Sequence, residues 1–596
     1  MTTSFIHPAL ILICGALLLP CIKEPFRKLY LCSVPLLTFS DVIYLNWHPG
    51  VHGVVLFMDK WTLTFGRVDT LSMVFGFIMA LMAIIGTVYG LHVRDNWQHI
   101  AAWFYVAGSL GVIYSGDYLV LFLFWEIMAF ASTFLIWFNT DKGALAAGYR
   151  YLLVHTFGGV LLLLGFVLRY QATGDLSFVQ LDQQNTQLFT WLIMAGLMLN
   201  AAVPPLHSWL PDAYSKATVT GAVFMCAFTT KTAVYTLARA FAGFEILIVL
   251  GVIMAIYGII YAMMENDIRK LLGWEIVSQV GYMVAGVGIG TALAINGTCA
   301  HAFAHILYKG LLFMAAGAVI HSTGKSKFTE LGGLWRKMPN TLFFMVIGGI
   351  SVSAFPFFSG FVSKSMIITA SFESHFILAG FLLTMVSIGT FLVAGLRLPY
   401  LIFFGEDRCS IDTREKAADP PWNMHMAMAV AAFLCLLVGC YYPFLYNMLP
   451  NPEVVYHPYG AYHLSETLQI LAFTALAFIF LKHNLGAKAS ISLDLDWFYR
   501  MAGRGFLWLA QNPIQWVDTA WGSAYKVVGL YSLMITAKFW SWFDWHGIDG
   551  VVDGSARCVQ ACGRRITIVL QKGHIQQTIY FSVTFAAILL ISYVCL

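Results

Sequence analysis

The chain has 596 residues, of which 59% are hydrophobic and only 11% are charged, and its formal net charge is +4. A soluble protein would carry roughly 25% charged residues, so an ordinary soluble domain is excluded, and the small net charge gives no sign of a nucleic-acid partner. Apolar runs repeat along the whole chain, each near the ~20 residues that a helix needs to cross a ~30 Å hydrocarbon core. They predict an all-α polytopic membrane protein and exclude a transmembrane β-barrel, whose strands would alternate over ~10 residues.

The apolar runs predict about 14 to 16 transmembrane helices. They cover approximately residues 4–21, 29–46, 71–92, 100–115, 118–138, 151–170, 189–204, 219–242, 245–264, 273–293, 297–320, 340–357, 376–397, 426–445, 464–481 and 578–595. The first run has no basic segment before it, so we expect it to be a retained span and not a cleaved signal.

Lys and Arg gather in alternate short loops, at 23–28, 92–95, 140–150, 265–270 and 321–337. The loops between them are poor in these residues, as in 171–188. The positive-inside rule then predicts an external N-terminus and cytoplasmic basic loops. We expect a multi-pass protein of the bacterial cytoplasmic (inner) membrane. Beyond residue 357 the alternation is interrupted and the topology stays open.

The segment 490–577 has a different composition from the spans. It holds seven tryptophans among basic and acidic residues: Trp497, Trp508, Trp516, Trp521, Trp540, Trp542 and Trp545. Such a mixture is typical of the membrane interface. We expect a lateral, interfacial amphipathic helix followed by a terminal span at 578–596; the alternative is a small cytoplasmic packing domain.

Ionisable side chains inside apolar runs are costly and usually functional. Those of this chain are Glu126, Lys231, Glu275, His301, His305, Lys309 and Lys364, and the polar Asn200 accompanies them. In the stretch HAFAHILYKG, two histidines and a lysine recur at intervals of four, which places them on one face of a helix.

A row of this kind suits proton transfer. Histidine changes charge near neutral pH, and a desolvated lysine can release its proton in the same range. Neighbours one turn apart are ~5–6 Å apart, close enough for a bridging water. The alternatives are hydrogen-bonded structural histidines, a Lys364 that extends to the surface, and a Glu126 that only pairs with a nearby lysine.

Prolines interrupt two of the runs, at Pro204 and Pro205 and again at Pro356, which is followed by Gly360. Proline breaks a helix, and paired broken helices are typical of transporters built from inverted repeats. We therefore expect two inverted five-helix repeats, with Asn200 and Lys364 beside the two breaks. The predicted divisions are 1–98 (N-terminal helices), 99–243 (first repeat), 244–405 (second repeat), 406–489 (additional helices), 490–577 (lateral segment) and 578–596 (terminal helix).

Four stretches carry a resemblance to a known family: FWEIMAFASTFLIWF, PPLHSWLPDAYSKATVTGAVFMCAFTTKTAVYTLAR, ENDIRKLLGWEIVSQVGYM and HAFAHILYKGLLFMAAGAVIHSTG. Over roughly 70–440 the chain resembles the antiporter-like subunits shared by respiratory complex I, membrane-bound hydrogenases and Mrp-type sodium/proton antiporters. Within that group it looks most like the D-type subunit of the Mrp antiporters, and LDLDWFYR (493–500) favours the same branch. The C-terminal end is similar to that of the longest complex I subunit, which carries a lateral helix.

The resemblance implies half-channels joined by a polar axis. In it, Glu126 tunes the first half-channel, Lys231 is a bridging lysine, and Lys364 controls proton uptake or exit at the second broken helix. The central relay that it implies consists of His301, His305 and Lys309.

Two positions depart from the family pattern. The family usually has a lysine where Asn200 stands, and an amide carries no proton. Glu126 then pairs with Lys231, or Asn200 coordinates a cation or holds a water. Glu275 is an additional carboxylate, and the simple alternative for it is an ion pair with Arg269 or Lys270.

We therefore expect a proton-translocating subunit of a multisubunit monovalent cation (Na⁺)/proton antiporter, a transporter more than an enzyme. Its expected partners are other membrane subunits, protons, sodium and lipid. No metal or cofactor is expected, since the sequence has no Walker loop, no cysteine set for an iron–sulfur cluster and no dinucleotide fingerprint. The alternatives are a proton-pumping subunit of a complex I-like (NADH-quinone oxidoreductase-type) or hydrogenase-type complex, a proton channel for a zinc-bearing partner in inorganic-carbon uptake, and an inactive scaffold.

Overall fold

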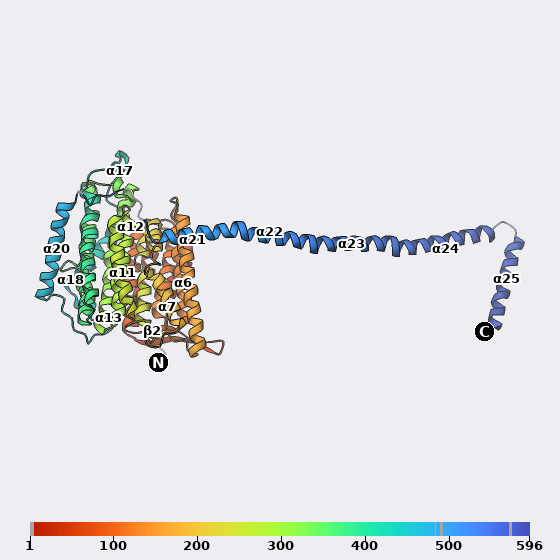
Figure 1. The fold of residues 1–596 in the computed structure, drawn as a ribbon, viewed down its shortest axis with the longest axis horizontal. Coiled ribbons are helices and arrows are strands. Elements are labelled where there is room, and N and C mark those ends of the chain that lie inside the picture. The colour runs from red at the N-terminus through yellow and green to blue at the C-terminus, as the bar shows by residue number, and fades with distance from the viewer. Residues whose placement is uncertain (1–4, 483, 489–492, 571–574, 596) are drawn as a thin grey trace. The chain divides into compact units, whose positions relative to one another are not determined.

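The computed structural model describes residues 5–482, 484–488, 493–570 and 575–595. The chain divides into two units, a bundle unit (Met1–Leu495) and a tail unit (Asp496–Leu596). The bundle unit is an assembly of roughly parallel and antiparallel helices (Figure 1). This arrangement confirms the predicted all-α, polytopic fold class.

The α-helices of the bundle unit lie at or near the predicted runs. They are α1 (Pro8–Leu18), α2 (Phe26–Asn46), α3 (Thr70–Tyr89), α4 (Asn96–Tyr114), α5 (Tyr118–Trp137), α6 (Ala144–Thr173), α7 (Leu188–Asn200), α8 (Trp209–Lys216), α9 (Val219–Met225), α10 (Thr229–Ala240), α11 (Ile246–Met264), α12 (Ile268–Ile289), α13 (Ala292–Thr323), α14 (Pro339–Val352), α15 (Ser359–Glu373), α16 (Ile377–Thr390), α17 (Ile411–Lys416), α18 (Trp422–Cys440), α19 (Pro443–Tyr446) and α20 (Ala461–Leu481). Two π-helical stretches, Phe391–Arg397 and Tyr400–Phe404, continue α16. Short 3₁₀ turns cover Leu19–Cys21, Gly90–His92, Phe328–Glu330 and Leu334–Arg336.

Within the described residues of the whole chain, 11 helices are long and apolar enough to cross a membrane. Three shorter apolar helices accompany them, and two of these, α7 and α14, end at the predicted breaks. Each predicted span overlaps a helix, and the chain is a multi-pass membrane protein. The sequence did not predict α15 as a separate helix, because Ser359–Glu373 contains four serines and a lysine among its apolar residues.

A β-hairpin that the sequence analysis missed follows α2. Strand β1 (Gly50–Phe57) pairs antiparallel with β2 (Trp61–Val68). The hairpin is anchored to the start of α5, since the Thr64 N–H donates to the Asp117 carboxylate at 2.6 Å. It covers the end of the bundle that also carries the N-terminus (Figure 1).

The predicted internal repeat is visible in matching backbone details. Asp117 caps the N-terminus of α5, and Asp267 caps that of α12 in the same way. Isolated β-bridges join Asp117 to Ser177 and Asp267 to Lys327, at equal spacing. The extent of five spans for each repeat, and with it the opposite directions of the two repeats, stays a prediction. The exact domain boundaries stay predictions.

Both breaks are present where the sequence placed them. Between α7 and α8 the chain leaves the helix over Ala201–Ser208, which includes Pro204 and Pro205. Between α14 and α15 it does so over Ser353–Phe358, which includes Pro356. Each break contains an alanine with left-handed backbone at its second residue, Ala202 at φ 60° and Ala354 at φ 58°.

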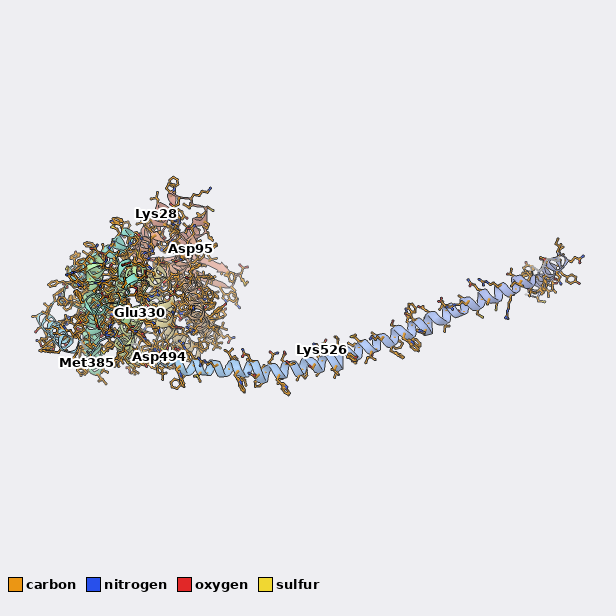
Figure 2. All side chains as sticks on the ribbon, turned by 90° about the horizontal axis from the view of Figure 1, so that it is seen from above. Lys28, Asp95, Glu330, Met385, Asp494 and Lys526 are labelled. Atoms are coloured by element: carbon orange, nitrogen blue, oxygen red, sulfur yellow. The ribbon has the colours of Figure 1, made fainter. Side chains whose placement is uncertain are left out.

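Hydrogen bonds between loops extend the predicted topology beyond residue 357. Arg27 donates to the Val93 carbonyl, which joins two of the basic loops; Figure 2 shows Lys28 and Asp95 of these loops on neighbouring segments. Asp419 accepts from the Thr341 N–H. The loop after α16 therefore lies at the same end as the basic loop before α14, opposite the end with the N-terminus and β2 (Figure 1).

The tail unit begins as a nearly continuous helix. Its segments are α21 (Asp496–Leu509), α22 (Gln515–Ala524), α23 (Ser532–Phe543) and α24 (Asp549–Leu570), joined by π turns at Ala510–Ile514, Tyr525–Tyr531 and Asp544–Ile548; α25 spans Ile575–Val594. No residue of α21, α22 or α23 is buried, and side chains such as Lys526 project freely (Figure 2).

The tail therefore forms a long helix and no compact packing domain among its described residues. Residues 490–492 and 571–574 of the predicted lateral segment lie outside the described residues. The lateral, interfacial position of this helix stays a prediction.

Candidate functional site

A buried ion pair between α12 and α13 is the centre of the candidate site. The Lys309 Nζ lies 2.6 Å from the Glu275 Oε2, and both side chains are 0% exposed. The alternative pairing with Arg269 or Lys270 is wrong, because the Arg269 guanidinium donates instead to the Ala217 carbonyl at 2.7 Å. Separating two such charges inside a protein is strongly unfavourable, so whatever ends this contact must also move a proton or a charge.

The row predicted on one helix face lies on α13 and is fully buried. The rings of His301 and His305 have centres 6.2 Å apart. Neither ring nitrogen of His305 has a hydrogen-bond partner among the described residues. His301 Nδ1 lies 3.2 Å from the Ser363 Oγ on α15. The row thus leads from the ion pair toward the second broken helix.

Lys364 stands at the far end of this row, on α15. It is buried, so it does not extend to the surface. Its Nζ donates to the Val352 carbonyl at 3.0 Å, at the end of α14, and lies 5.1 Å from the centre of the Tyr282 ring. A cation is stabilised at a helix C-terminus and over an aromatic face.

Gly360 explains how the two halves of the second broken helix come so close. A Cβ at this position would contact the Ser351 carbonyl oxygen and, at 3.5 Å, the Ala354 nitrogen. The predicted break at Pro356 and Gly360 therefore has a steric basis, and it brings the Lys364 ammonium to the carbonyl that α14 leaves free.

Lys231 lies in the first turn of α10, directly after a third interruption between α9 and α10. Its Nζ donates to the Cys226 carbonyl at 2.7 Å and to the Thr230 hydroxyl at 3.1 Å. It therefore does not pair with Glu126. The helix that carries it, α10, packs against both α12 and α13, so its charge faces the row.

Glu126 and Asn200 lie in the first repeat, against two adjacent glycines of α6. The Glu126 Oε1 lies against Gly159 and has no hydrogen-bond partner among the described residues. The Asn200 Oδ1 is 3.5 Å from the position that a Cβ on Gly158 would take. Asn200 is fully buried, and its side chain interacts with that of His155 on α6. Asn200 ends α7 on the backbone before the break, whereas Lys364 follows its own break, so the two are not equivalent in position.

His155 on α6 belongs to the same group and was missed by sequence reasoning. It is buried, its ring interacts with the Asn200 side chain, and its ring centre lies 4.5 Å from that of Trp209. A lone histidine in an apolar run carries no signal. A comparison of the two repeats would have identified His155, because the spacing from Glu126 to His155 is almost the same as that from Glu275 to His305.

The repeat also shows what the first half lacks. Glu126 and Glu275 each follow a tryptophan on the second helix of their repeat, and His155 corresponds to His305. By the same correspondence, Gly159 stands where the second repeat has Lys309. The carboxylate–ammonium pair is therefore complete in the second repeat alone, and in the first repeat the carboxylate occupies the space that a side chain would fill.

Asp494, from the motif LDLDWFYR, lies beside the first break. Its Oδ1 is 3.3 Å from the His207 Nε2 and accepts the Tyr257 hydroxyl at 2.6 Å. Burial alone would raise the pKa of Asp494, but interactions with His207, Tyr257 and Ser208 outweigh this and lower the pKa to about 2. The carboxylate therefore stays ionised and attaches the segment 493–495 to the first break.

The fold and the site together define a class: a polytopic helical membrane protein with a buried carboxylate, lysine and histidine row between broken helices. Residues 115–392 match the model of the NADH:quinone oxidoreductase/Mrp antiporter transmembrane family. This part of the chain is therefore similar to the transmembrane region that Mrp antiporters and NADH:quinone oxidoreductases share.

Two curated relatives extend the match along the chain. The chain is 27% identical over 563 residues to the A-type subunit of the Na(+)/H(+) antiporter of Alkalihalophilus pseudofirmus, covering 81% of this chain and 69% of that protein. It is 28% identical over 503 residues to the A1-type subunit of the Na(+)/H(+) antiporter of Staphylococcus aureus, covering 75% of this chain and 62% of that protein. Both relatives are longer proteins and both are A-type by name, so they do not support the prediction of a D-type subunit.

Three solved structures share the fold. A chain of the Mrp complex from Dietzia sp. has a TM-score of 0.67 at 20% identity, covering 78% of this chain and 98% of that chain. A chain of the archaeal membrane-bound sulfane sulfur reductase gives 0.65 at 22% identity, with coverage of 78% and 98%. A chain of respiratory complex I from Thermus thermophilus gives 0.61 at 22% identity, with coverage of 73% and 96%. All three belong to membrane complexes or respiratory assemblies.

Proposed function

We propose that this chain is the proton-translocating subunit of a multisubunit monovalent cation/proton antiporter in the cytoplasmic membrane of a bacterium. The observation that carries the proposal is the fully buried Glu275–Lys309 pair, which α13 continues through His305 and His301 to Lys364. The names of the curated relatives, Na(+)/H(+) antiporter subunits, give the cation class.

In this proposal the ion pair is the switch. While Glu275 is ionised, Lys309 keeps its proton because the opposite charge stabilises it. A proton delivered to Glu275 removes that charge, and Lys309 then passes its own proton through water to His305. Lys364 first releases its own proton to water, and its neutral amine then accepts the proton that His305 passes to His301. Lys309 recovers a proton from Glu275, which restores the pair. The transfers from Lys309 to His305 and from His305 to His301 each cover about one turn of α13.

Lys231 and Glu126 have secondary roles in this scheme. The positive charge of Lys231 faces the row from α10 and disfavours a second charge near His305, so it drives the proton toward Lys364. Glu126 lies against α6 without an ammonium partner, and we assign the group of Glu126, His155 and Asn200 to proton delivery in the first repeat.

We further propose that the chain occupies a place like that of the A-type and not of the D-type subunit. The names of the curated relatives support this placement. Its partners are then the other membrane subunits of the complex, and its substrates are protons and a monovalent cation, with sodium as the first candidate.

A redox-linked role is the second candidate. The likeness to chains of the sulfane sulfur reductase and of complex I, together with the long helix of the tail unit, favours it. The proteins that purify with the chain distinguish the two roles: redox proteins would favour the second, and small membrane proteins without redox centres the first.

The test is ion flux by the purified complex in proteoliposomes, with sodium and potassium compared. We expect cation-dependent proton movement that Lys309→Ala abolishes while the complex still assembles. Unchanged flux in Lys309→Ala would remove the row from the mechanism, and flux that ignores both cations would contradict the antiporter assignment.

A further inference from the structure

A cavity of about 420 Å³ opens beside the buried Lys364. Its polar lining comes from the second break and from three helices: Ser353, Lys364, Ser365, Thr369, Glu373, Thr384, Ser387, His463, Glu466 and Thr467. The cavity exceeds by far the ~10–15 Å³ that one water needs, and these side chains give waters beside them hydrogen-bonding partners within a lining that is otherwise mostly apolar.

The cavity follows one face of α15 from the break to the end of the helix. Lys364, Ile368 and Phe372 line it at intervals of four, and each is followed by a second lining residue, the last of which is Glu373. Nine residues of helix from Lys364 to Glu373 rise about 13 Å. Along this path exposure increases, from the buried Lys364 through the half-buried Thr369 to the exposed Glu373. The cavity therefore connects the end of the row with the surface.

The opposite wall is α20, which lies outside the family match at residues 115–392. His463 and Glu466 are half-buried and one turn apart on the face toward the cavity. The His463 ring stacks on Phe361 with centres 4.7 Å apart, and its Nε2 is buried without a hydrogen-bond partner among the described residues. His463 lines the cavity with its ring held by Phe361, and an imidazole changes charge near neutral pH, so it can accept a proton and pass it on.

The mouth of the cavity lies at the end of the bundle that carries the N-terminus. Glu373 ends α15, and Tyr462 starts α20 directly after the loop 441–460. That loop is held to the starts of α3 and α13, because the Pro450 carbonyl accepts from Thr70 and the Asn451 carbonyl accepts from Asn296. The positive-inside rule places this end outside the cell.

We propose that His463 and Glu466 of α20 are proton-transfer groups that carry protons between Lys364 and the external side through this cavity. The inference rests on the proposed function and adds to it two residues and a helix beyond the family region. A proton leaves the Lys364 Nζ for a cavity water, is taken up by His463 or Glu466, and is released to bulk water. The titratable groups that face the cavity are Lys364, Glu373, Tyr462, His463 and Glu466, while α16 contributes only Thr384 and Ser387 among its polar residues.

Water access is tested first, in membranes that carry the complete complex. Ser365→Cys and Ser371→Cys form a matched pair on α15, because both serines are buried and each hydroxyl bonds the carbonyl four residues back. Ser365 lines the cavity, whereas Ser371 does not, although it is nearer to the helix end. A membrane-impermeant thiol reagent is added from outside, and labelling is measured on the individual peptides by mass spectrometry.

We expect at least about tenfold faster labelling at position 365 than at position 371. If labelling depended only on the distance from the external end of α15, position 371 would react faster than position 365. Equal or slower labelling at position 365 would therefore overturn the water-filled path. This measurement needs no ion flux, and it therefore tests the cavity even if the proposed antiport fails.

Proton transfer is tested next, with His463→Gln and Glu466→Gln in the same flux assay. We expect flux to fall about tenfold or more in each, its dependence on external pH to change, and Glu466→Asp to restore most of it. Glu453→Gln, at an exposed acid in the preceding loop, is the control and should leave flux unchanged. Normal flux and an unchanged pH profile in both variants would overturn the role of α20, even with position 365 labelled.

Discussion

Glu275 and Lys309 form an ion pair with a nitrogen–oxygen distance of 2.6 Å, on helices that bury both side chains completely. Their counterparts in the first repeat are a glutamate and a glycine, Glu126 and Gly159. The resemblance noted from the sequence implies an ammonium in the first broken helix, whereas this chain has Asn200 there. The charge pair of this molecule is therefore found in the second repeat, next to the histidine row, and this placement sets the effects expected of each substitution.

Replacing Glu275 by Gln should leave the Lys309 ammonium buried without a counter-charge. We expect a loss of about 3–5 kcal/mol in the free energy of unfolding and a fall in proton flux of about 10²-fold or more. Thermal unfolding of the complex and flux in proteoliposomes measure the two effects. Glu330→Gln is the control, because Glu330 pairs with Lys325 at the surface, where such a pair contributes about 0–1 kcal/mol.

A double change separates stability from transport at this pair. Glu275→Leu combined with Lys309→Met removes both charges and keeps the volume, so we expect the melting temperature to return toward that of the unmodified protein. Flux should stay low. A double variant that transports normally would show that the pair is only structural.

Asn200→Lys should supply the ammonium that the first repeat lacks. The side chains of residues 126 and 200 lie on the adjacent glycines of α6, so a lysine can reach the unpaired Glu126 carboxylate. We expect the rate of proton flux to change by about tenfold, or its dependence on pH to shift, because the new lysine ammonium favours the ionised form of Glu126. Asn200→Leu adds bulk without charge and serves as the comparison; identical behaviour of the two variants would place residue 200 off the path.

Gly360→Ala should separate the two halves of the second broken helix. The new Cβ would contact the Ser351 carbonyl oxygen, and overpacking of this kind costs about 1–3 kcal/mol. Val352, whose carbonyl accepts from Lys364, is the neighbour of Ser351 at the end of α14. The substitution should therefore also displace Lys364, and proton flux should fall as well. Gly460→Ala is the control, since no atom lies within 4 Å of a Cβ there. Equal melting temperatures for the two variants would contradict the close approach.

Asp494→Asn should weaken the attachment of the segment 493–495 to the first break. The pKa of Asp494 is lowered to about 2, so its ionised form stabilises the folded protein. That contribution is fully present above the ordinary aspartate pKa of about 3.9 and is lost as the pH falls through about 2. The difference in melting temperature between the two proteins should be constant from pH 5 to 7 and shrink below pH 4. A difference that grows on acidification would show that the carboxylate is not the stabilising group.

The sequence by itself determined the helices, the two breaks and the row on α13. Apolar length and the 3.6-residue period are properties of consecutive residues, and proline acts on its own turn, so His301, His305 and Lys309 could be placed on one face without knowledge of their neighbours. The sequence did not predict the hairpin at residues 50–68, because its short strands of mixed polarity resemble an apolar run with a loop.

Only the tertiary structure decided which charges meet. Glu275 could be assigned to Arg269 or Lys270 because they are close in sequence, but the side chain faces α13 and pairs with Lys309. Likewise, Lys231 bonds the Cys226 carbonyl and not Glu126, whose Oε1 has no hydrogen-bond partner in the part of the chain that the structure describes. His155 and Asp494 acquire their neighbours from distant segments. The physical reason is that apolar helices of similar composition fit together by shape, and their order and rotation in the bundle are set by contacts that no local pattern records.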